Sequence, residues 1–333
     1  MTRELTAGRR RAALVGGALA VAVATALGLA SGPDGAALAW LDDDASRALV
    51  LELRGARVLL ALLVGAALSA TGAALQALLR NPLADPYIIG VSGGAAVGGA
   101  LVIALGASAA LASVPVGAFL GAFLASAGLS WFVARGGEQR SDAALLAGVV
   151  FNSFAAAVIT LIKTLLPADR SYSLLFWLVG NLPYVDGRTL LGVGAMVVAG
   201  VLLLARVSGR LELLSLGDVE ARRLGVPVFG TKLLVYGVAS ALVAVVVPVT
   251  GMIGFVGLVV PHALRLAFGP DQRLLVAASA LFGAATLALF DAAARLSFVA
   301  LGTELPVGAL TALVGAPVFA LALARRVMRG GAA

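Results

Sequence analysis

Residues 87–134 decide the fold, because "YIIGVSGGAAVGGALVIALGASAALASVPVGAFLGAFLASAGLSWFVA" contains no charged side chain. A helix that crosses a bilayer needs about 20 consecutive apolar residues. The stretch is too long for one such helix and has the length of two. We expect the two helices to meet in a turn near Ser113 and Pro115.

The composition of the whole chain points the same way. Of 333 residues, 61% are hydrophobic and 12% are charged, whereas a soluble domain carries about 25% charged residues. One globule cannot bury so much apolar surface, so the expected solvent is lipid. There is no Cys and one His, His262, which excludes disulfides, thiolate metal sites and multi-histidine metal sites.

Further apolar segments predict more crossings. They are residues 12–30, 58–79, 143–162, 189–205, 233–264, 274–294 and 307–324. Basic residues flank 233–264 on both sides, and Pro and Gly punctuate 248–261, so this segment is expected to cross twice. The first 30 residues also resemble a signal peptide, but their apolar run exceeds the usual ~7–15 residues and favours a retained helix.

The predicted fold is therefore an all-α, polytopic transmembrane helix bundle. It has about ten spans and both termini in the cytoplasm, and residues 1–333 form a single transmembrane domain. This topology places 17 of the 24 Lys and Arg residues on the cytoplasmic side, as the positive-inside rule requires. The basic excess thus reports membrane topology and predicts no nucleic-acid partner.

A polar interruption stands out at residues 79–99, "LRNPLADPYIIGVSGGAAVGG". Its glycines lack the preceding strand and the Lys-Ser/Thr ending of a phosphate-binding loop. Gly93, Gly94, Gly98 and Gly99 are instead expected to let helices pack closely. The preceding polar residues are expected to form a cytoplasmic turn; they are Asn81, Pro82, Asp85 and Pro86.

Four segments carry a family resemblance. "ALQALLRNPLADPYIIGVSGGAAVGGAL" (74–101), "LSLGDVEARRLGV" (214–226), "IGFVGLVVPHALRL" (253–266) and "ELPVGALTALVGAPVFALAL" (304–323) occur in this order. Together they resemble the FecCD-type permeases, the membrane subunits of type II ABC importers for iron-siderophores, haem and cobalamin.

The resemblance implies a set of partners. They are a second permease subunit, identical or sibling, around a central pathway, two cytoplasmic ABC ATPase subunits, and an extracytoplasmic substrate-binding protein. The chain would itself be no enzyme and need no cofactor, because ATP is hydrolysed by a separate chain. No Walker A motif occurs in the sequence.

The resemblance also assigns roles to residues. Residues 211–231 would couple to the ATPase through a short helix capped by Asp218, or would form a solvated amphipathic loop. The coupling residues are Leu216, Gly217, Asp218, Ala221, Leu224 and Gly225. The cytoplasmic gate would comprise Asn81, Leu83 and Ser141, while Asn152 would line the pathway or bond a neighbouring helix.

Arginines mark the predicted outer end. Arg54 and Arg57, before the second span, and Arg295 would dock the binding protein, or would anchor helix ends at the headgroups. Asp291 and Arg295 are spaced to form an i,i+4 pair. His262 is expected to be a structural polar residue; the alternative is a haem ligand.

Three other functions are less consistent with the sequence. An ion-coupled secondary transporter would need buried carboxylates and internal repeats, yet Asp291 is the one acidic residue within the predicted spans. An intramembrane enzyme would need a nucleophile with a base, or a metal cluster. A gated channel fits the composition but not the resemblance of residues 214–226.

Overall fold

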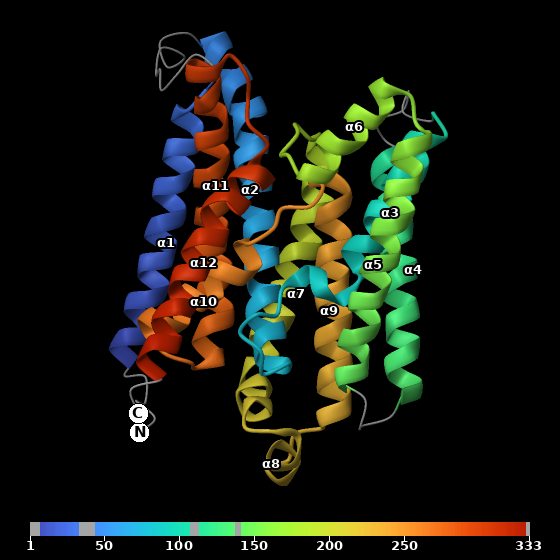
Figure 1. Cartoon of the computed structure of the whole chain (residues 1–333). Helices are drawn as coiled ribbons and strands as arrows, with labels where there is room; N and C mark the ends of the chain where they lie inside the picture. Colours follow the sequence, from blue (N-terminus) through green and yellow to red (C-terminus); the bar gives the residue numbers. More distant parts are fainter. Residues whose placement is uncertain (1–6, 33–43, 107–112, 137–140, 331–333) are drawn as a thin grey trace.

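The computed structural model describes residues 7–32, 44–106, 113–136 and 141–330, and Figure 1 shows them as a bundle of helices. The helices are α1 (Ala7–Ala30), α2 (Asp44–Leu78), the 3-10 helix η2 (Pro86–Ile89), α3 (Val91–Ala104), α4 (Ser113–Gly136), α5 (Ser141–Leu165), α6 (Ala168–Val179), α7 (Gly187–Ser215), α8 (Asp218–Arg223), α9 (Val228–Thr250), α10 (Val256–Phe268), α11 (Gln272–Leu301) and α12 (Val307–Gly330).

The helix lengths fit a membrane protein. Within the described ranges, six helices are long and apolar enough to cross a bilayer, namely α1, α2, α5, α7, α9 and α11. Four shorter apolar helices lie in α3, α4, α10 and α12. At 1.5 Å per residue, the 14 residues of α3 rise only about 21 Å, against a hydrocarbon core of about 30 Å.

Helix α2 forms the centre of the bundle and contacts α1, α7, α9, α10 and α11. Its side chains Leu60, Leu68 and Leu75 are fully buried. Glycine lets its neighbours approach: a Cβ atom placed on Gly65 would lie 2.2 Å from the carbonyl oxygen of Gly283 in α11. Lipid supplies no hydrophobic drive between helices, so such close packing holds the centre together.

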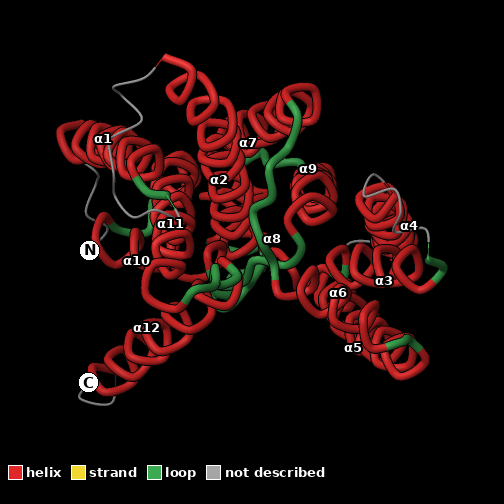
Figure 2. The backbone as a smooth tube through the Cα atoms, turned by 90° about the horizontal axis from the view of Figure 1, so that it is seen from above, coloured by secondary structure: helices red, strands yellow, loops and turns green. Residues whose placement is uncertain are grey.

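Helices α3 and α4 pack through paired glycines. A Cβ atom on Gly94 would lie 2.4 Å from the Gly121 carbonyl oxygen, and one on Gly98 would lie 2.1 Å from that of Gly117. Gly93 packs against Asn152 of α5, and a Cβ on Gly99 would clash with Trp177 of α6. The predicted packing role of these glycines is confirmed. Figure 2 shows α3, α4, α5 and α6 grouped on one side of α9.

The structure corrects several predicted boundaries. Helix α3 ends at Ala104 and α4 begins at Ser113, so the predicted separation into two helices is confirmed, but Ser113 and Pro115 lie inside α4. Helix α7 continues to Ser215 and shortens the loop expected from residue 211. The break between α9 and α10 comprises residues 251–255, while Pro248 and Pro261 lie inside helices. Helix α6 was not predicted.

Candidate functional site

Helix α8 protrudes from one end of the bundle (Figure 1), where α1 also begins and α12 ends. The predicted short helix is confirmed at 218–223, but its N-cap is Gly217 and Asp218 is its first residue. The Asp218 carboxylate instead accepts a hydrogen bond of 2.5 Å from Lys232 Nζ in α9. This ion pair fixes α8 to the start of the next long helix.

The predicted coupling residues divide by exposure. Ala221 is fully buried and its carbonyl oxygen accepts from Val226 N at 2.9 Å. Leu216 and Leu224 are 63% and 57% exposed, and Val219, which the sequence reading missed, is 59% exposed. Gly217 and Gly225 have φ angles of +120° and +83°, which favour glycine. The result is a short helix that the Asp218–Lys232 pair fixes and that the exposed apolar side chains of Leu216 and Leu224 flank. Its own exposed residues are Val219, Glu220, Arg222 and Arg223.

The segment after α2 is the predicted inner-gate turn. Asn81 Oδ1 accepts from Leu83 N at 2.9 Å, and this Asx-type turn leaves Leu83 44% exposed. Pro86 is buried, and a Cβ on Gly257 would lie 2.6 Å from its ring. The turn at Asn81 and Pro82 is as expected, but Pro86 belongs to a 3-10 helix that packs inside the bundle.

The other two predicted gate residues lie on α5. Ser141 is its first residue, and its side chain lies outside the described part of the structure. Asn152 is half-buried and its Nδ2 donates to the carbonyl oxygen of Tyr87 in η2 at 2.9 Å. Asn152 was expected either to line the pathway or to bond a neighbouring helix, and the structure shows a hydrogen bond to the neighbouring η2.

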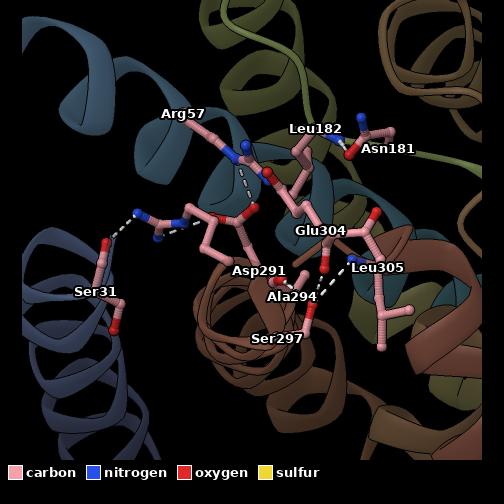
Figure 3. A network of polar contacts seen from close by, with 11 residues as sticks. Ser31, Arg57, Asn181, Leu182, Asp291, Ala294, Ser297, Glu304 and Leu305 are labelled. Carbon is pink, nitrogen blue, oxygen red and sulfur yellow. Dashed lines mark hydrogen bonds and ion pairs between the residues drawn. The ribbon is translucent and has the colours of Figure 1, made fainter. Parts of the chain in front are cut away.

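The predicted docking arginines gather at the end opposite α8, where Arg57 and Asp291 point toward one another (Figure 3). Arg57 Nε donates to Asp291 Oδ1 at 2.8 Å, and Arg57 Nη2 binds the Glu304 carboxylate. Arg295 is 4% exposed, pairs with Asp291 at 2.9 Å, and donates to the carbonyl oxygen of Ser31 at 2.7 Å. The predicted Asp291–Arg295 pair is confirmed.

This cluster differs from the expectation in two respects. Arg54 and Arg57 lie within α2, which begins at Asp44, and not before a span. All three arginines have partners in their own chain, since Arg54 Nη1 donates to the Leu29 carbonyl oxygen at 3.3 Å. Docking therefore stays a prediction, and the observed role is to join α1, α2 and α11. Glu304 was missed because its contact with Arg57 spans 247 residues.

His262 is buried in α10, with its ring edge-on to Phe319 of α12 at a centroid distance of 5.3 Å. This packing agrees with the prediction that His262 is a structural polar residue.

The pattern of the FecCD transport family matches residues 12–325. The chain belongs to the FecCD transport family. It is 38% identical to the cobalamin import system permease protein BtuC of Halobacterium salinarum over 86% of this chain and 76% of that protein. It is also 38% identical to the hemin transport system permease protein HmuU of Yersinia pestis over 87% of each chain.

A solved structure resembles this FecCD-family chain in three dimensions. It is described as an inward-facing conformation of a metal-chelate type ABC transporter, is 32% identical, and superposes with a TM-score of 0.84. The match covers 94% of this chain and 98% of that one. The predicted family, the helical fold and the multi-pass membrane location are therefore confirmed.

Proposed function

We propose that the chain is the permease subunit of an ATP-driven importer and that residues 1–333 form one transmembrane domain. It crosses the membrane ten times, and both termini are cytoplasmic. Six long and four shorter apolar helices support the count. The beginning of α1 and the end of α12 lie at the same end of the bundle as α8 (Figure 1), which supports the shared side of the termini.

The observation that carries the proposal is α8. A soluble ATPase groove can receive a short helix that is fixed by Asp218–Lys232, that exposes Val219, and that is flanked by the exposed Leu216 and Leu224. Acidic residues in its first turn and basic residues in its last turn also complement the helix dipole. Two ATPase subunits would dock on α8 and its counterpart in a second permease subunit, identical or sibling.

The cargo proposed is a metal chelate of the size of cobalamin, haem or an iron-siderophore. Relatives named for cobalamin and hemin import support this class. A substrate-binding protein would deliver the cargo to the arginine end. Arg54 and Arg57 are partly exposed there and would meet its carboxylates, while the buried Arg295 would act through Asp291. At the other end, Asn81, Leu83 and Ser141 would narrow the cytoplasmic mouth, with Asn152 holding the adjoining segment.

The ion-coupled alternative has less support. A coupling carboxylate must exchange a proton or bind an ion. Asp291 is fully buried but is engaged by both Arg57 and Arg295, so it is a poor candidate for either task.

The test is transport by the assembled complex in proteoliposomes. The chain is co-expressed with an ABC ATPase and a binding protein, and ATP-dependent uptake of cyanocobalamin, hemin and a ferric siderophore is compared. Leu224→Glu should abolish ATPase binding and uptake. Arg188→Glu is the control: Arg188 lies at the start of α7, the end remote from α8, so ATPase binding should stay intact. ATP-independent uptake driven by an ion gradient would refute the proposal.

A further inference from the structure

Residues 251–255 interrupt the helical backbone between α9 and α10 inside the bundle. Ile253 is 1% exposed, and outside a helix its N–H and C=O groups need other partners. In a membrane protein such groups must be satisfied within the protein, because lipid offers no hydrogen bonds. One side chain satisfies both: the Tyr87 hydroxyl accepts from Ile253 N at 2.9 Å and donates to Ile253 O at 3.1 Å.

Tyr87 lies on the segment that follows α2, and hydrogen bonds to its backbone N–H and C=O groups hold it in place. Its N–H donates to Asp85 Oδ1 at 2.8 Å. Its carbonyl oxygen accepts from Asn152 Nδ2 of α5 at 2.9 Å and from Ser92 Oγ at 3.2 Å. One residue thus joins the turn after α2, the helix break and α5.

A second contact fixes the same two segments. A Cβ atom on Gly257, the second residue of α10, would lie 2.6 Å from Pro86 Cγ and 2.8 Å from the Leu68 carbonyl oxygen. Pro86 and Gly257 therefore touch without space for a methyl group. The turn and the break are close-packed beside the hydrogen bonds of Tyr87, and close-packed contacts transmit displacement.

The other side of the break contacts elements nearer the arginine end. Asn181 N donates to the Thr250 carbonyl oxygen at 2.8 Å. A Cβ on Gly251 would lie 2.0 Å from the Trp177 carbonyl oxygen of α6, and one on Gly308 would lie 3.0 Å from that of Met252. The break thus lies between the turn after α2 and the elements α6 and α12.

We propose that Tyr87 is a positioning residue that couples the turn at residues 79–90 to the α9–α10 break, so that the two segments move together. Through the break, movement of α6 and α12 reaches the turn that carries Asn81 and Leu83. The inference deepens the proposed transport function and rests on it, because it supplies the link between the two mouths of the pathway.

The absence of cysteine from the chain allows a direct test. The full chain carrying Ala84→Cys is placed in lipid nanodiscs, and the maleimide labelling rate at position 84 is measured, because Ala84 lies in the same turn and is 1% exposed. Hydrogen exchange of peptides covering 251–255 is measured in parallel. Tyr87→Phe removes only the hydroxyl, and Tyr172→Phe is the matched control because Tyr172 is 72% exposed.

If Tyr87 couples the segments, Tyr87→Phe should raise both rates together, by about 5–30-fold for the loss of one to two kcal/mol of bonding. The control should change neither. Faster exchange at 251–255 with unchanged labelling at position 84 would mean that Tyr87 only satisfies the hydrogen bonds of the break, and would overturn the coupling. So would no change in either rate.

A second variant separates coupling from a merely structural role. A Cβ on Gly254 has open space around it, so Gly254→Ala should stiffen the break without a clash. With Tyr87 present, Gly254→Ala should slow labelling at position 84, and in the Tyr87→Phe background this effect should vanish. An equal effect in both backgrounds would overturn the inference. None of these readouts needs cargo or ATPase, so failure of the transport proposal would appear separately, as uptake without ATP.

Discussion

Neutralising the buried carboxylate of Asp291 should destabilise the bundle. It is fully buried, and its two carboxylate oxygens face Arg57 and Arg295 at 2.8 and 2.9 Å. Asp291→Asn keeps the volume and removes the charge that both guanidinium groups share. Removing one member of a buried ion pair costs about 3–5 kcal/mol, because the remaining charge is left uncompensated.

Two observations place the expected value at the lower end of that range. Arg57 retains the carboxylate of Glu304, and Arg295 retains the carbonyl oxygen of Ser31. In addition, Arg295 Nη2 and Asp291 Oδ2 are close enough for an ion pair but are not aligned for a hydrogen bond. We therefore expect Asp291→Asn to lower the free energy of unfolding by about 3 kcal/mol.

The assay is reversible unfolding of the purified chain in mixed micelles titrated with sodium dodecyl sulfate. Asp169→Asn is the matched control, since Asp169 is exposed at the start of α6 and should change stability by less than about 0.5 kcal/mol. Arg57→Gln and the double variant complete a cycle whose coupling should be about 0.5–3 kcal/mol. Equal effects of Asp291→Asn and Asp169→Asn would refute the reasoning.

Three further outcomes are expected. Gly94→Leu should separate α3 from α4 and lower the thermal unfolding midpoint, whereas Gly128→Leu should not, because a Cβ on Gly128 meets nothing within 4 Å. Lys232→Met should weaken co-purification of the ATPase, because α8 loses its ion pair with Asp218; unchanged recovery would separate that pair from docking. Leu83→Cys in both permease subunits should crosslink in one nucleotide state more than another, and state-independent crosslinking would remove Leu83 from the gate.

Local spacing predicted much of the fold because helices and close helix contacts depend on near neighbours in the sequence. Uncharged runs reveal membrane helices, and glycines four apart mark a face where another helix can approach. Gly94 and Gly98 were identified on this basis, as was the Asp291–Arg295 pair within α11. Helix α6 was missed because its 12 residues include Asp169 and Arg170 and are too short to cross a membrane.

Contacts between distant segments could not be predicted in this way. The bond from Tyr87 to Ile253 spans 166 residues and that from Arg57 to Asp291 spans 234. The residue pattern of either segment does not identify its partner. Many donors and acceptors elsewhere in the chain could form an equivalent bond, and the sequence does not say which of them lies nearby. The glycines and prolines of 248–261 predicted that the helix would be interrupted there, but not which group would satisfy the exposed backbone.

The two missed contacts nevertheless follow one physical rule. A helix break and a buried carboxylate each place polar atoms where lipid cannot solvate them, so each must be met from elsewhere in the chain. Ile253 is met by a phenol that both donates and accepts, and Asp291 by two guanidinium groups from different helices. Tyr87 and Arg57 lie on other elements than the groups that they meet, so losing either contact removes a link between two elements. The polar residues of this apolar chain therefore fix helix positions at the arginine end and in the middle of the bundle, as the ion pair of α8 does at the opposite end.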